Sequence, residues 1–237
     1  MLRDIVTSSL PGFTNTRAWI IARPTPSSAT TFSQLIVEIS PGGGAAKPEP
    51  RPASRASSSS PLGSSRSPSR ARGTCSRRAA TRSSRRGANW SLANEGDEIT
   101  SFHWIRKAYE WLEASTPPAS FVTRDQDIEP VPMPDTDGVW ATTRFADSND
   151  MAHDMQVNIV TFKPGGSIPF AETHVMEHGL FVLQGKAVYR LNDDWVECEA
   201  GDYMLLRSFC PQACYAGGPE DFRYLLYKDM NRQIKLT

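Results

Sequence analysis

Four side chains that can bind a divalent metal ion lie within seven consecutive positions: Glu172, His174, Glu177 and His178. Imidazole nitrogens and carboxylate oxygens are ligands for zinc, manganese and iron in proteins. The stretch around them reads FAETHVMEHGLFVLQG (170–185). Its chemistry depends on whether these side chains project from a helix or from bent β-strands, because each geometry brings different pairs of these four side chains together.

A helix would give this stretch the inverted zinc-peptidase pattern H-x-x-E-H, with the two imidazoles one turn apart and Glu177 as the base. The flanking residues favour strands. Pro169 precedes the cluster, Gly179 follows it, and the segment LFVLQGKAVYRL beyond it is typical of strands. A helix over 171–178 would have only about two turns, with no amphipathic continuation.

If the stretch forms strands, the distance between the candidate ligands restricts the path of the chain. Glu172 and His174 are two residues apart, so they share one face of a strand. His178 follows four residues later, roughly 13 Å away along an extended chain. That is close to the limit for two imidazoles that share one ion at about 2 Å each. We therefore expect a bend or bulge near Val175–Met176, as is common at a barrel rim.

The elements that must position these residues are predicted to be short strands. The last hundred residues contain MQVNIVTF (155–162), LFVLQG, KAVYRL, YMLL and DFRYLLY (221–227), separated by Gly, Pro and Asn-Asp turns. This pattern predicts a β-sandwich or small barrel. Two further strands are expected within 18–40, followed by a turn at 41–44, and the best helix candidate is 105–112. The domains are predicted as 1–114, a Pro-rich linker at 115–138, and 139–237.

The charge of the chain is unevenly distributed. The 26 basic and 26 acidic residues balance, but residues 51–86 hold ten Arg and twelve Ser and no acidic residue. The rest of the chain has a net charge of −10, which gives no global bias toward nucleic acid or membranes. The sequence has no signal-peptide pattern and no 18-residue apolar run. Its four cysteines lack CxxC pairing, which favours reduced thiols in a cytoplasmic protein.

The spacing of the metal-binding candidates resembles the first motif of the cupin superfamily, G-x5-H-x-H-x3-E-x6-G. Gly166 and Gly185 lie at the positions of its two glycines. Here Glu172 stands in place of the first His, and His178 in place of the Glu. The second cupin motif has a ligand eleven residues after a Gly, which in this sequence is Gln212, after Gly201. The resemblance therefore implies a ligand set of Glu172, His174, His178 and Gln212.

This altered set, together with ETHVMEHG, VYRLNDDWVECEAGDYMLL, QACYAGG and YLLYKDMNR, resembles the (S)-ureidoglycine aminohydrolase family. The resemblance is strong over 136–237 and is recognisable in LPGFTNTRAWIIARP, FSQLIVEISPGGG and the region after residue 87. It implies an all-β fold of two cupin barrels. It also implies hydrolysis of (S)-ureidoglycine to (S)-ureidoglycolate and ammonia in allantoin breakdown, in a homo-oligomer. Trp90 stands where the first barrel would have a metal-binding His, so only the second barrel is expected to bind metal.

The proposed ligands form a fairly hard donor set: two imidazoles, one carboxylate and one carboxamide, without a thiolate. Such a set suits Mn(II) or Fe(II) better than a structural zinc. The resemblance implies Mn²⁺, with Fe²⁺ and Zn²⁺ as alternatives.

The last predicted strand adds candidates for acid–base chemistry. Tyr224 and Lys228 share one face of it, and the resemblance gives both positions roles in handling the substrate. An inward Lys228 beside a cation would have a lowered pKa and could transfer protons. Lys228, Tyr224 and Glu172 are the catalytic candidates, which the sequence does not rank. Asn158 and Tyr189 are further candidates for the cavity lining.

Residues 51–86 do not match the family, which has the middle strands of the first barrel here. The segment could be translated out of frame, could be a disordered basic insert, or could be a nucleic-acid-binding arm. In the first two cases the N-terminal barrel would be incomplete. The alternative functions are therefore another metal-dependent cupin enzyme, such as a dioxygenase or isomerase, and a non-catalytic or inactive cupin.

Overall fold

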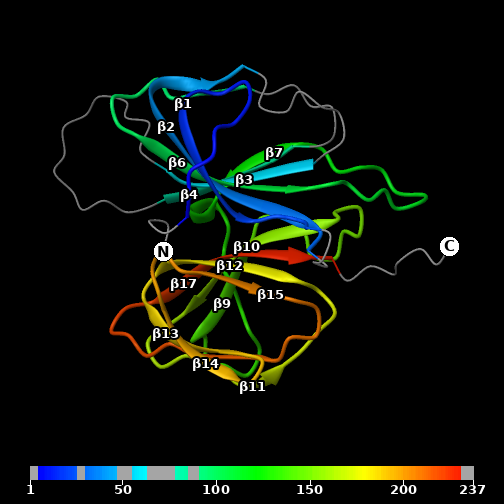
Figure 1. Ribbon diagram of the computed structural model, residues 1–237. Coiled ribbons are helices and arrows are strands. Elements are labelled where there is room, and N and C mark those ends of the chain that lie inside the picture. The colour runs from blue at the N-terminus through cyan, green and yellow to red at the C-terminus, as the bar shows by residue number, and fades with distance from the viewer. Residues whose placement is uncertain (1–4, 26–29, 47–54, 63–77, 85–90, 231–237) are drawn as a thin grey trace.

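The computed structural model describes residues 5–25, 30–46, 55–62, 78–84 and 91–230, with only backbone pairing described for 55–62 and 78–84. The chain folds into two β-rich halves stacked on one another (Figure 1). Nowhere in these ranges is there a helix long and apolar enough to cross a membrane. In chain order, the elements are β1 (Thr14–Ala22), β2 (Phe32–Ala45), β3 (Arg55–Leu62), β4 (Arg78–Ser84), β5 (Leu92–Ala93), β6 (Thr100–Lys107), β7 (Phe121–Arg124), the 3₁₀ helix η2 (Asp125–Asp127), β8 (Val131–Pro132), β9 (Trp140–Arg144), β10 (Met155–Phe162), β11 (Ser167–Glu172), β12 (His178–Gln184), β13 (Lys186–Leu191), β14 (Asp194–Glu199), β15 (Tyr203–Leu206), β16 (Gln212–Tyr215) and β17 (Phe222–Asp229).

The N-terminal half is one seven-stranded sheet in the order β1-β2-β6-β3-β4-β7, with β5 paired to β2. The prediction of a turn at 41–44 is wrong, because β2 continues to Ala45. Positive φ angles at Gly42 (70°) and Gly44 (147°) let the strand change direction without ending. A Cβ on Gly44 would lie 2.1 Å from the backbone oxygen of Leu92, so the pairing with β5 requires a glycine here.

Parts of the Arg/Ser-rich segment 51–86 are paired strands. The backbone of β3 pairs antiparallel with β6 and β4, and β4 pairs with β7. These strands lie where the family resemblance has the middle strands of the first barrel. The segment is thus at least partly integrated into the sheet, whereas the sequence predicts a disordered or misread insert. Residues 63–77 and Trp90 lie outside the described residues, and the reading-frame hypothesis stays a prediction.

The helix predicted at 105–112 is wrong, because 105–107 belong to β6 and 108–112 are not helical. Phe102 and Trp104 pack in the core of the N-terminal sheet. Ile105 packs in a second cluster, shared with the C-terminal half, and the ring of His103 lies 4.3 Å from that of Phe181 in β12. Burial on both faces removes the alternation of apolar and polar residues from which a strand is normally recognised.

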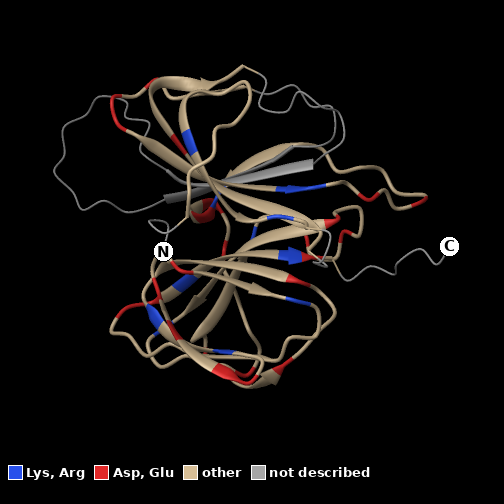
Figure 2. Cartoon of the chain, in the orientation of Figure 1, with Lys and Arg blue, Asp and Glu red and all other residues tan. Residues whose placement is uncertain are grey.

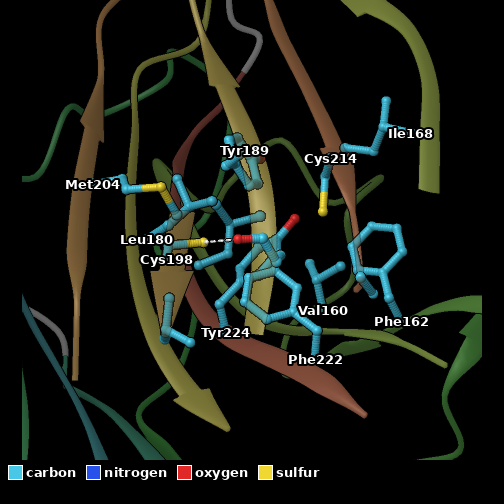
Figure 3. Packing of buried hydrophobic residues seen from close by; sticks show 14 of the residues in the cluster. Val160, Phe162, Ile168, Leu180, Tyr189, Cys198, Met204, Cys214, Phe222 and Tyr224 are labelled. Carbon is cyan, nitrogen blue, oxygen red and sulfur yellow. Dashed lines mark hydrogen bonds between the residues drawn. The ribbon is translucent and has the colours of Figure 1, made fainter. Parts of the chain in front are cut away.

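The C-terminal half has two sheets, β15-β12-β17-β10-β9-β8 and β11-β16-β13-β14. The strands predicted at 155–162, 186–191 and 203–206 coincide with β10, β13 and β15, and the all-β prediction is confirmed. Figure 3 shows part of the core of this half, where Tyr189, Phe162 and Phe222 are completely buried. The full cluster consists of Trp140, Val160, Phe162, Ile168, Leu180, Val182, Ala187, Tyr189, Cys198, Met204, Leu206, Cys214, Ala216, Phe222, Tyr224 and Leu226.

The six-stranded sheet is covered on its outer face by the N-terminal half. Phe32 of β2 stacks on Tyr227 of β17, with 3.8 Å between ring centroids. Ile105 joins the same cluster with Ile159 and Leu225. Figure 2 shows long uncharged stretches in the strands where the halves meet, while charges gather in loops and at strand ends. Strands β10 and β17 are therefore buried on both faces, with one face directed at the interior of the C-terminal half.

Candidate active site

The metal-binding candidates lie at a break between two strands. β11 ends at Glu172 and β12 begins at His178, and the chain bends at Val175 and Met176 between them. The predicted bend is confirmed, and the helix that a zinc peptidase requires is absent from this described stretch. A Cβ on Gly179 would lie 2.5 Å from Tyr203 Oη and 2.9 Å from Phe32 Cζ, so a larger residue at the start of β12 would force these side chains to shift.

The imidazole of His174 is at the centre of the cluster. Its Nε2 lies 3.5 Å from Glu172 Oε1 and 3.1 Å from Gln212 Nε2, and its ring centroid is 4.3 Å from that of His178. All four side chains line one cavity of about 300 Å³. The structure therefore brings together the four ligands that the family resemblance implies.

Strand register explains why residues forty positions apart meet here. Gln212, the first residue of β16, is the direct cross-strand partner of Glu172 in β11 and of Leu191 in β13. The β11–β16 pairing shifts register between Ile168 and Glu172, which marks a bulge in this rim strand. Glu172 and Gln212 are thus fixed side by side by backbone pairing.

Tyr189 orients the Gln212 carboxamide. Its buried hydroxyl donates a hydrogen bond of 2.7 Å to Gln212 Oε1, which leaves Nε2 facing the His174 ring. Turning the carboxamide by 180° exchanges its two polar atoms. Oε1 then faces the imidazoles, and Nε2 donates to the Tyr189 hydroxyl oxygen. The same pair of contacts can therefore hold Gln212 with or without a metal ion.

His178 is suited to bind a cation. Its side chain is buried, and Nε2 has no hydrogen-bond partner among the described residues. Burial lowers the pKa of His178 well below its usual value, and the charges of His174 and Lys228 act in the same direction. The imidazole is therefore neutral at neutral pH, which is the form that coordinates metals. An orphaned, buried ring nitrogen at a cavity wall is unusual unless a ligand satisfies it.

The described residues contain no ready-made group of three or more His, Cys, Asp or Glu side chains around a single point. The fourth candidate here is a carboxamide, and His174 Nε2 faces that carboxamide. Without an ion, polar side chains in a cavity satisfy one another. The donor types, their shared cavity and the orphaned nitrogen of His178 fit a divalent ion held by Glu172, His174, His178 and Gln212.

Tyr224 and Lys228 of β17 both line the cavity, on the face that strand alternation predicts. Burial raises the pKa of Tyr224 well above its usual value, so its hydroxyl stays protonated and acts as a donor. Burial also lowers the pKa of Lys228, and Arg144 adds to this effect while Glu172 opposes it. The ring of Tyr224 lies edge to face with that of Tyr189, 6.3 Å between centroids, so Tyr224 packs beside the residue that holds Gln212.

Asn158 lines the cavity, whereas Tyr189 reaches it only through Gln212. Arg144 and Gln156 also line the cavity, although they are not among the residues predicted from the sequence. Gln156 lies two residues before Asn158 in β10, on the same face, so strand alternation could have identified it. Nothing in the sequence near Arg144 marks it as inward-facing.

Glu177, the neighbour of His178, binds the N-terminal half. Its Oε1 accepts hydrogen bonds from the Thr31 backbone N–H (2.7 Å) and from the Thr31 hydroxyl. The side chain is buried, and burial raises the pKa of Glu177 although both Thr31 contacts oppose this. Glu177 therefore faces the junction between the halves, and its position is incompatible with the base of an inverted zinc peptidase.

A second bridge joins the halves beside the cavity. Lys107 Nζ of β6 contacts Asp229 Oδ1 at 2.6 Å and donates to the Asp154 carbonyl oxygen at 3.1 Å. The Lys107 side chain is only 4% exposed. Asp229 follows Lys228 directly and also lines the cavity. Both bridges thus reach residues adjacent to candidate site residues.

Comparison with known proteins places the chain among cupins. A cupin domain family model matches residues 158–227. The curated (S)-ureidoglycine aminohydrolase of Escherichia coli (strain K12) is 39% identical over 88 residues, which are 37% of this chain and 34% of that protein. The Arabidopsis thaliana enzyme of the same name is 34% identical over 128 residues, which are 54% of this chain and 42% of that protein. The matches cover less than half the length of the curated relatives.

Two solved structures have a similar fold over nearly the whole length of this chain. A Pseudomonas aeruginosa protein described as glyoxylate-induced is 54% identical with a TM-score of 0.84, covering 99% of this chain and 87% of that one. The protein Ylba from E. coli, 22% identical with a TM-score of 0.76, shares the fold over 99% and 91% of the two chains. The chain therefore has the cupin fold, belongs to one family with the glyoxylate-induced protein, and is similar over part of its length to the (S)-ureidoglycine aminohydrolases.

Proposed function

We propose that this chain is a metal-dependent hydrolase that converts (S)-ureidoglycine and water to (S)-ureidoglycolate and ammonia. One observation carries the proposal. Glu172, His174, His178 and Gln212 share a cavity with Tyr224 and Lys228, in the half of the chain that contains the cupin match. The names of the curated relatives supply the substrate.

The four-residue cluster would hold the ion, with Mn²⁺ as the proposed metal and Fe²⁺ or Zn²⁺ as alternatives. Such an ion, when bound, supplies Lewis acidity and an orienting point for the substrate. The hydrogen bond from Tyr189 would keep Gln212 directed at the site. This support matters because partners of this kind set the orientation and affinity of the ligands themselves.

The reaction needs a proton for the departing amine and a base for the attacking water. The carbon attacked carries an amine, a ureido group and a carboxylate. Lys228 would donate the proton to the amine nitrogen, since burial lowers the pKa of its ammonium group toward neutrality. Glu172 would accept the proton of water. Tyr224 would remain a hydroxyl and orient the substrate, because its raised pKa excludes a phenolate at neutral pH.

The proposal is tested by loading the purified full chain with Mn²⁺ and measuring ammonia release from (S)-ureidoglycine. We expect turnover by the wild-type chain and by Lys163→Gln, which loses an exposed cation outside the cavity. Lys228→Gln should lose at least about 100-fold in kcat, the scale of general acid catalysis. A folded, metal-loaded wild-type chain that releases no ammonia would overturn the proposal. Oxygen consumption by the iron-loaded chain would favour a dioxygenase instead. The cytoplasmic location and the homo-oligomeric state also remain predictions.

A further inference from the structure

Two paired strands place His178 opposite Lys228 in the wall of the cavity. The two residues are direct cross-strand partners in β12 and β17, and such partners have Cβ atoms about 5 Å apart. Glu177 precedes His178, Asp229 follows Lys228, and the Asp229 backbone N–H donates a 3.2 Å hydrogen bond to the Glu177 carbonyl oxygen. We call these four residues the ligand rung. The separation between a candidate metal ligand and the candidate acid depends on how this rung is held.

Both carboxylates of the ligand rung are held by the N-terminal half. Glu177 Oε1 accepts hydrogen bonds from the backbone N–H and the hydroxyl of Thr31. Asp229 Oδ1 lies 2.6 Å from Lys107 Nζ. The proposed reaction uses none of these four groups, although Glu177 and Lys107 are buried. The two contacts therefore need an explanation other than chemistry in the cavity.

The two contacts come from a single place in the N-terminal sheet. Phe32 of β2 is the direct cross-strand partner of Lys107 in β6, and Thr31 immediately precedes Phe32. Between the two contacts, the Phe32 ring stacks at 3.8 Å on that of Tyr227, the residue before Lys228. One pair of strands in the N-terminal half thus lies directly against the ligand rung.

The polar contacts are directional, whereas the stacked rings alone would allow the strands to slide. Burial acts to lower the pKa of Lys107, but the hydrogen bond and the charge of Asp229 outweigh burial and raise the pKa above its usual value. Lys107 is therefore charged at neutral pH. Charge-assisted hydrogen bonds are shorter than neutral ones and fix the geometry of their partners. Lys107 and Thr31 are thus suited to set the position of the ligand rung.

We propose that Thr31 and Lys107 are positioning residues for the reaction, which hold Glu177 and Asp229 and thereby fix His178 relative to Lys228. The inference rests on the proposed function for the roles of His178 in metal binding and of Lys228 in proton transfer. Neither Thr31 nor Lys107 is among the residues that line the cavity, so each acts only through its partner. Displacing a reacting group by about 1 Å can cost about 100-fold in rate, so a small loosening is measurable.

The first test changes Thr31, which is exposed and can be replaced without disturbing the core. Thr31→Val removes the hydroxyl but keeps the branched shape and the backbone hydrogen bond, whereas Thr31→Ser keeps the hydroxyl and loses a methyl group. We expect Thr31→Val to lower both Mn²⁺ affinity and kcat by about fivefold, the scale of one hydrogen bond. Thr31→Ser should match the wild type. Competition with a fluorescent chelator measures the affinity, and ammonia release from (S)-ureidoglycine measures kcat.

The second test changes Lys107. Lys107→Met removes the charge but keeps an unbranched apolar stem, and it should lower kcat by about tenfold or more while KM stays within about twofold. Lys107→Arg restores the charge and should recover part of the loss. Lys163→Gln removes an exposed cation outside the cavity and should keep the wild-type values. Thermal melting sets a temperature at which every variant is folded, and Mn²⁺ is saturating.

The outcomes separate this inference from the proposed function. If Thr31→Val and Lys107→Met keep the wild-type Mn²⁺ affinity and kcat, the inference is overturned and the function stands. A loss in Thr31→Ser as large as that in Thr31→Val also overturns it, because the methyl group would then matter and not the hydroxyl. If the wild type binds Mn²⁺ but releases no ammonia, the proposed function fails. The Mn²⁺ affinity of Thr31→Val then decides the inference, which a wild-type value overturns and a fivefold loss supports.

Discussion

The two halves of the chain use β-sheets for different purposes. The C-terminal half encloses a cluster of sixteen buried residues between two sheets and keeps a polar cavity at its end. In the described part of the N-terminal half, one sheet has six buried residues on its own core face, and its other face covers the C-terminal half. The difference indicates that the N-terminal sheet supports the site from outside, while the C-terminal half supplies the chemistry.

The largest expected effect tests whether metal binding belongs to the C-terminal half alone. His174→Ala removes the central ligand candidate and should lower Mn²⁺ affinity by more than about 100-fold, beyond the loss typical of supporting residues. The matched change in the N-terminal half is His103→Gln, which replaces a buried histidine outside the cavity. Metal content per folded chain is measured after dialysis. Equal retention by His174→Ala and wild type would refute the ligand assignment.

The next prediction concerns the bridge between the halves. Lys107→Ala leaves Asp229 without its partner at a largely buried contact and should destabilise the protein by about 3 kcal/mol. Lys163→Ala breaks a more exposed pair with Asp221 and should cost less than about 1 kcal/mol. Urea denaturation measures both. Similar losses would mean that the bridge between Lys107 and Asp229 stabilises the junction no more than an exposed ion pair does.

Acid sensitivity should arise partly at the junction. Burial lowers the pKa of His103 from 6.5 to about 3, so the folded protein keeps this ring neutral while the unfolded chain protonates it below pH 6.5. Protons then favour the unfolded chain, and stability falls with pH between about 6.5 and 3. We expect His103 to contribute a loss of about 2–3 kcal/mol between pH 7 and 4.5. His103→Gln should flatten the measured stability profile by that amount, and an unchanged slope would contradict the assignment.

The smallest effect concerns the support of Gln212. Tyr189→Phe removes the 2.7 Å hydrogen bond to its carboxamide but keeps the buried ring. We expect Mn²⁺ affinity to fall by about tenfold, the lower end for a partner of a metal ligand. Competition with a fluorescent chelator measures the affinity. Cys198→Ala, in the same core, is the control that should leave metal affinity unaltered.

The sequence was most informative where a function is encoded in short spacings. Glu172, His174 and His178 could be identified because a strand end, a bend and a strand start are all local, and Gln212 followed from one motif distance. Arg144 could not be found, since its position depends on the pairing of β9 with β10. The strand at 100–107 was missed because two different cores cover its faces.

The Arg/Ser-rich segment shows another limit of composition. It contains few residues that could form a core, which favours disorder. Backbone pairing with β6 and β7 nevertheless gives 55–62 and 78–84 places in the sheet. Every residue except proline supplies both a backbone donor and a backbone acceptor for pairing between strands. Composition alone therefore underestimates which segments can pair with neighbouring strands.

Strand β17 has a consequence for how this chain tolerates change. Tyr224 and Lys228 face the cavity from it, while Leu225 and Tyr227 pack at the junction with the N-terminal half. Because successive side chains point to opposite faces, one inserted residue within β17 would exchange the two sets beyond the insertion point. An insertion ahead of Tyr224 would turn Leu225 and Tyr227 toward the cavity and Lys228 toward the junction between the halves. A single inserted codon would therefore disrupt the candidate site and the packing of the two halves at once.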